Sequence, residues 1–202
     1  MIKNIIFDMG QVMIRWQPAL LIEHLNLSEE EQNLIFREVF QSVEWVQLDR
    51  GTISEADAAE AMCRRLPEKL HPAAQTMVKD WWKRPLVPMP GMAELAGELK
   101  GKGYGVYLLS NASIRLREYF HRIPGSEHFD GVLVSAEHKL LKPQHEIYET
   151  LFATFSLKPE ECFFVDDAVV NIEGALVCGM KGFVFRGDAD ALRKELTWRN
   201  IL

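Results

Sequence analysis

The polar residues best suited to chemistry in this 202-residue chain directly follow three short apolar runs. They are Asp8, then Ser110 and Asn111, then Asp166 and Asp167. Three carboxylates cannot gather at pH 7 without a compensating cation, because each one disfavours the ionised form of the others. Carboxylate oxygens are hard ligands of the kind that Mg²⁺ prefers. If the three runs meet in the fold, the chain therefore carries a magnesium site with a hydroxyl group beside it.

Two further residues suit this predicted site to a phosphate group. Lys142 lies in the stiff apolar segment Leu140–Pro143, where a lysine is well placed to face inward as a counter-charge. Gly10 has no side chain, so an anion can closely approach the backbone N–H groups beside Asp8. Together these groups predict phosphoryl chemistry, in which positioning and charge neutralisation do most of the work.

The apolar runs themselves predict the strands that position these residues. Five runs lack polar alternation, as expected for a parallel sheet with both faces covered. They are Ile2–Phe7, Gly105–Leu109, Val132–Val134, Cys162–Val165 and Gly182–Phe185. Helical patterns between the last four cover roughly Ile114–His121, Gln144–Phe155 and Asn171–Cys178. This alternation predicts a doubly wound α/β sheet, in which ligands bind at the carboxyl ends of the strands.

The segment between the first two predicted strands is much longer than a simple crossover requires. Its last part, Gly91–Lys100, predicts one crossover helix, and the rest predicts an all-helical insertion over the carboxyl edge of the sheet. Its four helical stretches contain Leu20–Leu25, then Leu34 to Val46, then a helix beginning at Ser54, then Met77–Trp82. We therefore expect a core domain of residues 1–14 and 85–202 and a helical cap domain of residues 15–84.

Composition narrows the classes of partner. The chain has 23 Lys and Arg against 29 Asp and Glu, a net charge of −6, which argues against a broad electrostatic grip on nucleic acid or anionic lipid. No apolar stretch reaches the length of about 18 residues that predicts a membrane-spanning helix. Three cysteines without CxxC spacing predict reduced thiols. We expect a cytoplasmic monomer or weak homodimer whose partner is a small phosphorylated metabolite, with no nucleic acid and no membrane partner.

The chain resembles the haloacid dehalogenase superfamily, whose members are mostly Mg²⁺-dependent phosphatases. The four matching motifs are Phe7–Val12, Leu108–Asn111, Lys142-Pro143 with Ile147-Tyr148, and Phe164–Asp167 with Asn171-Ile172 and Gly179-Met180. The resemblance covers the whole predicted sheet domain, and the insertion falls where the family carries its small mobile cap. The chain looks most similar to the subgroup that includes bacterial alpha-D-glucose-1-phosphate phosphatases, and its insertion from Glu44 to Ser54 is similar to that subgroup's cap.

The resemblance implies a Rossmann-like strand order of 3-2-1-4-5 and roles for the motif residues. Asp8 would be the nucleophile that takes the phosphoryl group as an aspartyl-phosphate, which divides a difficult hydrolysis into two steps. Lys142 would neutralise charge on Asp8 and on the phosphate. Ser110 would bind a phosphoryl oxygen, helped by the N–H of Asn111.

The resemblance also implies a set of metal ligands. Asp166 and the carbonyl of Gly10 would hold Mg²⁺ beside Asp8. Asp167 would lie near the metal, either as a direct ligand or through a water molecule.

Gly10 is a departure from the commonest phosphatase motif, which has there a second Asp that acts as general acid and then as base. Such help is typically worth ~10²–10⁴-fold in rate, although a good leaving group such as a sugar 1-phosphate needs less protonation. Glu44, Asp49 and His138 are replacement candidates only if the cap or a nearby loop carries them over the site. A solvated surface position is the first expectation for all three.

Four tryptophans, Trp16, Trp45, Trp81 and Trp82, lie in or beside the insertion. Helix packing explains such a cluster by itself. For Trp16 and Trp45 we also expect a place in the substrate pocket, where an aromatic ring can pack on a sugar.

The sequence favours a Mg²⁺-dependent phosphatase acting on a small phosphate monoester, with a sugar phosphate such as a hexose 1-phosphate as a candidate. Three alternatives stay open. A catalytically weak regulatory protein that binds a phosphometabolite is consistent with Gly10. A 2-haloacid dehalogenase needs no metal, so the pair Asp166-Asp167 argues against it. A phosphomutase is disfavoured by the missing acid–base residue.

Overall fold

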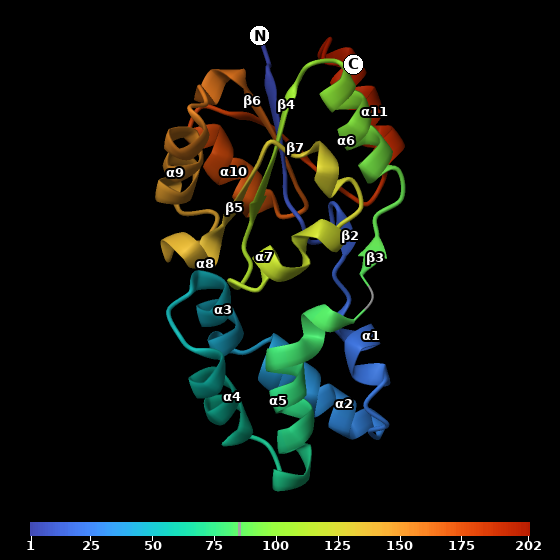
Figure 1. The fold of residues 1–202 in the computed structure, drawn as a ribbon, viewed down its shortest axis with the longest axis vertical. Helices are drawn as coiled ribbons and strands as arrows, with labels where there is room; N and C mark the ends of the chain where they lie inside the picture. Colours follow the sequence, from blue (N-terminus) through green and yellow to red (C-terminus); the bar gives the residue numbers. More distant parts are fainter. Residues whose placement is uncertain (85) are drawn as a thin grey trace.

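The computed structural model describes residues 1–84 and 86–202 and consists of a sheet region and a helical region (Figure 1). Pro85, where the second predicted core segment begins, lies outside the described residues. Among the described residues, no helix is long and apolar enough to cross a membrane.

Five parallel strands form the central sheet in the order β5-β4-β1-β6-β7. They are β1 (Asn4–Phe7), β4 (Gly105–Ser110), β5 (Gly131–Val134), β6 (Cys162–Asp166) and β7 (Lys181–Val184). Counted along the chain among these five, the order is 3-2-1-4-5, and the predicted doubly wound α/β class is confirmed. The labels skip two numbers because β2 (Ile14–Arg15) and β3 (Val87–Pro88) form a separate antiparallel pair. That pair was not predicted, and β2 crosses the expected domain boundary between residues 14 and 15.

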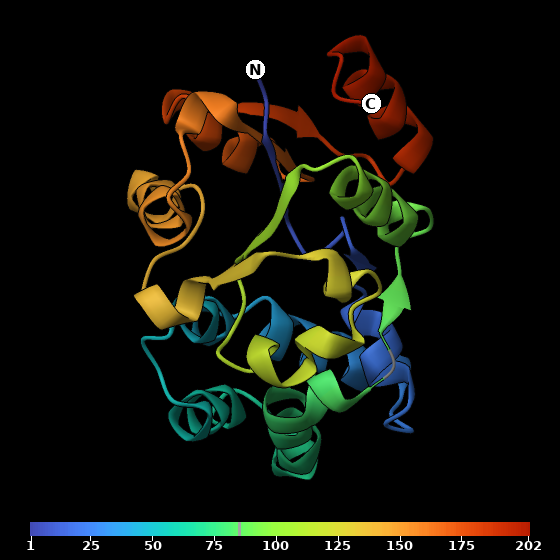
Figure 2. The ribbon, with the colours of Figure 1, turned by 45° about the horizontal axis from the view of Figure 1, so that its top comes forward.

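Helices cover both faces of the sheet, and alternate side chains of β1 face opposite layers. Ile5 and Phe7 share one buried cluster with α6 (Met92–Gly101) and α11 (Ala189–Trp198). Ile6 belongs to a second cluster with α9 (His145–Phe155) and α10 (Val169–Val177). Figures 1 and 2 show these two helix pairs on opposite sides of the sheet. Both faces of the sheet are therefore apolar and closed to solvent.

The strand register brings the predicted site residues to one edge. Phe7 pairs with Leu108 on one side and with Val165 on the other. Because the strands are parallel, the residues that follow these three lie level with one another at the carboxyl edge.

The helical region has its own buried cluster, which includes Ile22, Ile35, Met62 and Met77. Its helices are α1 (Pro18–Glu23), α2 (Glu29–Ile35), α3 (Val43–Arg50), α4 (Glu55–Cys63) and α5 (His71–Asp80). The region leaves the sheet after β1 and returns before α6, as the insertion predicted from the sequence does.

One predicted helical stretch is wrong in detail. The apolar pattern from Leu34 to Val46 is divided, because a π-helical turn follows α2 and α3 begins only after Ser42. The Ser42 hydroxyl accepts a hydrogen bond from the Trp45 N–H at 3.1 Å and donates to the Val39 carbonyl at 2.7 Å. This cap starts a new helix, in which Val43 and Val46 are 69% and 50% exposed instead of buried.

The helix predicted at Ile114–His121 is also shorter than expected. It consists of α7 (Leu116–Tyr119) and one 3₁₀ turn. The short helix α8 (Ser135–His138), after β5, and the long C-terminal α11 were not predicted.

Candidate active site

Three carboxylates meet at the carboxyl edge of the sheet. Asp8 follows β1, Asp166 ends β6, and Asp167 follows it, and each offers an oxygen within 4.8 Å of the others. Asp8 and Asp166 are buried, whereas Asp167 is half-buried. A small set of carboxylate oxygens at this spacing is a donor set that fits Mg²⁺.

The Lys142 side chain is 1% exposed and points into this cluster. Its Nζ lies 2.8 Å from Asp8 Oδ1 and 2.6 Å from Asp166 Oδ2, and it donates to the Leu109 carbonyl at 3.0 Å. Burial disfavours the charged ammonium, but the two carboxylates outweigh it and raise the pKa of Lys142 above its ordinary value. The expectation that this lysine faces inward agrees with the geometry.

One lysine does not fully compensate the buried carboxylates. Burial raises the pKa of Asp8 above its ordinary range, and the charge of Asp166 adds to this rise while Lys142 opposes it. An additional cation beside Asp8 would favour its ionised form, which is what a nucleophilic carboxylate requires. The electrostatics of the cluster thus fit a metal ion as well as its donor atoms do.

Asn171 is a site residue whose role was missed in the sequence, although it falls within the fourth motif. Its side-chain amide lies 3.0 Å from both carboxylate oxygens of Asp166. The N–H of Ala168 donates to Asp166 Oδ1 at 2.8 Å. These donors fix the orientation of Asp166, and they come from the first turn of α10 and the residue before it.

The side chain of Asn111 binds the backbone of Lys142, whereas its backbone N–H is the predicted phosphate donor. The side-chain Nδ2 donates to the Lys142 carbonyl at 3.1 Å, and Oδ1 accepts from the Lys142 N–H at 2.8 Å. The side chain therefore fixes the backbone that carries the catalytic lysine candidate, while the Asn111 N–H stays the predicted phosphate donor. Ser110 is buried beside it at the end of β4.

A cavity of about 120 Å³ lies over these residues, between the sheet region and the helical region. Its floor includes Asp8, Gly10, Ser110, Asn111 and Lys142, and its helical side includes Trp16, Trp45, Asp49 and Trp81. The structure thus brings every predicted catalytic and phosphate-binding residue together. Asp167 belongs to the carboxylate cluster but is not among the residues that line the cavity.

Aromatic rings form much of the helical side of this cavity. The ring centres of Trp16 and Trp81 lie 4.6 Å apart, and those of Trp16 and Trp45 lie 5.9 Å apart. Tyr119 extends the cluster, 5.3 Å from Trp81. Trp16 and Trp45 lie at the cavity as expected, and Trp81 is an additional lining residue that the sequence pattern assigned to helix packing.

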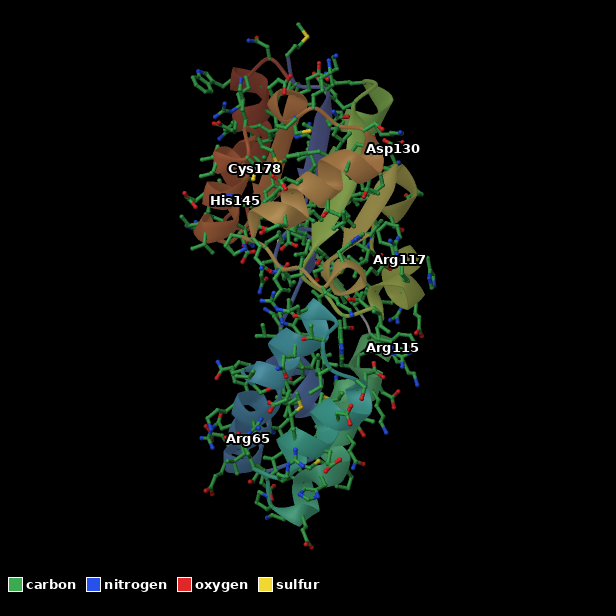
Figure 3. The ribbon with its side chains drawn as sticks, turned by 90° about the vertical axis from the view of Figure 1, so that its left-hand side faces the viewer. Arg65, Arg115, Arg117, Asp130, His145 and Cys178 are labelled. Atoms are coloured by element: carbon green, nitrogen blue, oxygen red, sulfur yellow. The ribbon has the colours of Figure 1, made fainter. Side chains whose placement is uncertain are left out.

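The three candidates to replace the missing general acid differ in whether they lie at the cavity. Asp49 lines the cavity. Glu44 instead pairs at 2.7 Å with Arg65, which Figure 3 labels in the helical region. This hydrogen bond lowers the pKa of Glu44 to about 2. His138 is exposed at the end of α8. Only Asp49 is carried over the site.

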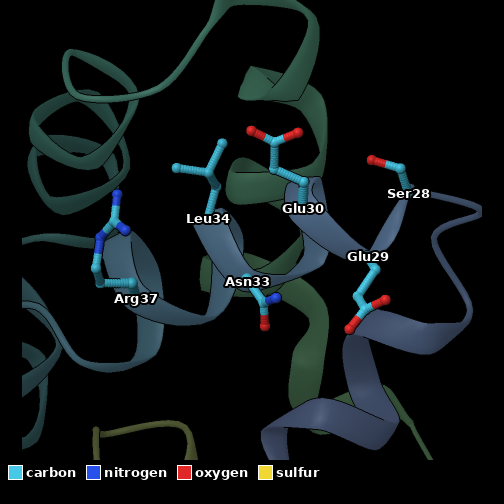
Figure 4. A pocket seen from close by; sticks show the side chains of 6 residues that line it. All are labelled: Ser28, Glu29, Glu30, Asn33, Leu34 and Arg37. Atoms are coloured by element: carbon cyan, nitrogen blue, oxygen red, sulfur yellow. The ribbon is translucent and has the colours of Figure 1, made fainter.

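A wider hollow runs along α2, but it does not belong to this site. It is open to solvent, and it is lined by Ser28, Glu29, Glu30, Asn33, Leu34 and Arg37 (Figure 4). These residues come from α2, its cap and the π-helical turn that follows it, and none of them lines the cavity at Asp8.

The fold and the carboxylate cluster define a class of hydrolase. The profile of the haloacid dehalogenase-like hydrolases matches residues 2–179. The sesquiterpene phosphatase astK of Aspergillus oryzae is 30% identical over 184 residues, which cover 89% of this chain and 88% of that protein. The chain therefore belongs to the haloacid dehalogenase-like hydrolase family. The narrower glucose-1-phosphate phosphatase-like subgroup stays a prediction.

Solved structures share the fold at lower identity. The HAD family enzyme bt-2542 of Bacteroides thetaiotaomicron, solved with magnesium and inorganic phosphate, is 22% identical with a TM-score of 0.70, over 95% of this chain and 99% of that one. The L-2-haloacid dehalogenase of Xanthobacter autotrophicus is 19% identical with a TM-score of 0.68, over 100% of this chain and 85% of that one. The fold alone does not choose between phosphate chemistry and dehalogenation.

Proposed function

We propose that this protein is a Mg²⁺-dependent phosphatase that hydrolyses a small phosphate monoester through an aspartyl-phosphate on Asp8. The observation that carries the proposal is the cluster of Asp8, Asp166 and Asp167 around the buried ammonium of Lys142. A metal-independent dehalogenase has no need of three carboxylates at one point. The two buried ones are costly unless cations compensate them.

In this proposal each residue of the cavity floor has one task. A carboxylate oxygen of Asp8 attacks phosphorus, and the bond from phosphorus to the ester oxygen breaks. Lys142 and the Ser110 hydroxyl hold the charge of the phosphoryl oxygens, together with the N–H of Asn111. Water then attacks the same phosphorus, which releases inorganic phosphate and restores Asp8.

The metal would be held by carboxylate oxygens of Asp8 and Asp166 and by the carbonyl of Gly10, with Asp167 beside them. Asn171 and the Ala168 N–H orient Asp166 for this role. When bound, Mg²⁺ supplies positive charge to the phosphoryl oxygens as the transition state forms.

The residues between 15 and 84 would act as the cap domain over the core of residues 1–14 and 85–202. The small cavity with its wall of Trp16, Trp45 and Trp81 supports a small ester, and a hexose 1-phosphate is one candidate. We further propose that the protein acts in the cytoplasm on a phosphorylated metabolite, as a monomer or weak homodimer, without nucleic acid or membrane partners.

The test is phosphate release from a panel of small phosphate esters that includes hexose 1- and 6-phosphates. Each ester is assayed with Mg²⁺, with a chelator and with Asp8→Asn. We expect turnover that requires both the metal and Asp8. Mg²⁺-dependent binding of an ester without turnover would instead support the alternative of a regulatory binding protein. The observation that favours this alternative is the lack of a carboxyl group at position 10. Halide release in the presence of chelator would support a dehalogenase.

A further inference from the structure

Asp49 reaches the cavity from the last turn of α3, on the helical side of the site. The next turn lies directly against the sheet region. Gly51 has a φ of 72°, and a Cβ at this position would lie 2.1 Å from the Ala136 carbonyl oxygen. Any side chain at Gly51 would therefore push the helical region away from α8, so the approach depends on glycine.

Two hydrogen bonds hold the same turn on the sheet region. The Ser135 hydroxyl donates to the Asp49 carbonyl at 2.5 Å. Arg50 donates to the Gln144 side chain at 2.7 Å, and Gln144 also accepts from the Leu141 N–H at 2.9 Å. Because Leu141 precedes Lys142, the turn that carries Asp49 is tied to the segment that carries the buried lysine. Asp49 is thus positioned relative to the reacting groups and not only within its own helix.

The surroundings of the Asp49 carboxyl group favour its protonated form. It is half-buried, opens onto the cavity and accepts a hydrogen bond from the Ser113 N–H, and no Lys, Arg or His pairs with it among the described residues. Burial raises the pKa of Asp49 well above its ordinary value, and the negative charge of Asp8 adds to the rise. A carboxyl group that opens onto the cavity and whose pKa is raised is suited to donate a proton to a substrate oxygen.

We propose, building on the phosphatase function, that Asp49 is the general acid and base of the reaction and replaces the carboxyl group that position 10 lacks. In the first step Asp49 gives its proton to the ester oxygen while the bond from that oxygen to phosphorus breaks and the bond from Asp8 to phosphorus forms. In the second step the Asp49 carboxylate takes a proton from the water that attacks phosphorus. The products are the alcohol and inorganic phosphate, and both aspartates return to their starting states.

Tyr119 is the other acidic side chain of the cavity wall, and it is less suited to this task. Its hydroxyl lies 3.7 Å from the Met9 sulfur, and burial raises its pKa further above the ordinary value for tyrosine. A proton held that tightly is a poor match to catalysis near neutral pH.

The proposal has a consequence for how the two regions cooperate. Asp49 belongs to the helical region, whereas Asp8 and Lys142 belong to the sheet region. Proton transfer therefore becomes possible only when α3 lies against α8, and loss of that contact removes the acid from the site.

The decisive experiment compares two substrates of nearly equal size, acetyl phosphate and ethyl phosphate. Acetate leaves without needing a proton, whereas the ethoxide of ethyl phosphate must be protonated. For Asp49→Asn we expect kcat/KM to fall by ~10²–10⁴-fold on ethyl phosphate and by less than about tenfold on acetyl phosphate. Asparagine keeps the size of the side chain and can still accept from the Ser113 N–H, so the fold should be retained.

Two further variants make the result specific. Glu44→Gln removes a carboxyl group from the same helix outside the cavity, and both rates should stay at the wild-type value. Gly10→Asp places a carboxyl group at the position where the family's common motif has one. A Cβ there would lie 3.8 Å from Trp16 Cβ, an ordinary contact, so the side chain can be accommodated. In the Asp49→Asn background, Gly10→Asp should recover ethyl phosphate hydrolysis by about tenfold or more.

Equal losses on the two substrates would overturn the role of Asp49 as an acid, because a merely structural residue affects both alike. Unchanged rates would overturn it as well. If the wild-type protein hydrolyses neither ester in an Mg²⁺- and Asp8-dependent way, the phosphatase proposal itself fails, and this outcome is distinct from the other two.

Discussion

The guanidinium of Arg115 and the carboxylate of Glu55 form a two-point ion pair across the boundary between the sheet and helical regions. Nε lies 2.7 Å from Oε1, and Nη2 lies 2.7 Å from Oε2. Arg115 immediately precedes α7, close to the helical region in Figure 3, and Glu55 is the first residue of α4. Neither residue lines the cavity, so the pair joins the two regions outside it, in the same arrangement that places Asp49 at the cavity.

This ion pair should stabilise the closed arrangement more than the fold of either region. Both side chains keep some exposure, so we expect a coupling of about 1 kcal/mol, which is roughly a fivefold effect. Arg115→Met, Glu55→Gln and the double variant should each lower kcat/KM by about that factor, with little change in melting temperature. Additive effects in this double-mutant cycle would show that the pair does not contribute to closure.

Lys142→Met should cost stability as well as activity. The substitution leaves Asp8 and Asp166 buried without their ammonium, a change that typically costs about 3–5 kcal/mol. The loss should be largest in chelator and smaller with Mg²⁺, because a second cation offsets part of the missing charge. Urea unfolding in both conditions measures it, with the exposed Lys83→Met as the control. Equal losses with and without Mg²⁺ would contradict a metal site beside this lysine.

Magnesium should stabilise the folded protein through the carboxylate cluster. Since a ligand that binds only the folded state adds RT ln(1 + [L]/Kd), Mg²⁺ at about 100 times its Kd should add about 2.7 kcal/mol. Asp166→Asn removes a buried ligand and should abolish the gain, whereas Asp57→Asn on the exposed face of α4 should keep it. A rise in melting temperature of equal size in both variants would place the ion elsewhere.

The pair between Glu44 and Arg65 should make stability depend on pH. Hydrogen bonding from Arg65 lowers the pKa of Glu44 from 4.5 to about 2, so the folded state binds its proton less tightly than the unfolded state. The stabilisation is then fully present above the unfolded pKa and is lost as the pH falls toward about 2. Arg65→Met should therefore cost about 1 kcal/mol at pH 7 and progressively less on acidification. Urea unfolding across this range tests the prediction, and a loss that does not change with pH would refute it.

Much of the candidate site could be predicted from the sequence because parallel strands end at one edge. Once Ile5–Phe7 and Phe163–Val165 are recognised as buried parallel strands, Asp8 and Asp166 are expected at the same edge of the sheet, and the strand order that the family resemblance implies makes the two strands neighbours. The inward position of Lys142 was also predicted, because a lysine within a stiff apolar segment is well placed to face inward and pair with a carboxylate.

The break at Ser42 was not predictable from apolar spacing, because it depends on one hydroxyl group that hydrogen-bonds the backbone on both sides of the break. The exposed positions of Val43 and Val46 follow from that local event. Periodicity records which residues are apolar, but not where one helix ends and the next begins.

The sequence by itself determined the strands, their polar ends and the metal-binding chemistry that those ends imply. Only the tertiary structure decided which residue of the helical region faces Asp8. The sequence pattern does not show which of Asp49, Glu44 and Trp81 lines the cavity. Their positions depend on how the helical region docks on the sheet region, through contacts between distant segments such as Ser135 with Asp49 and Arg115 with Glu55. The physical reason is that strand register follows from local pattern, whereas the docking of one region on another depends on the summed fit of two separately formed surfaces.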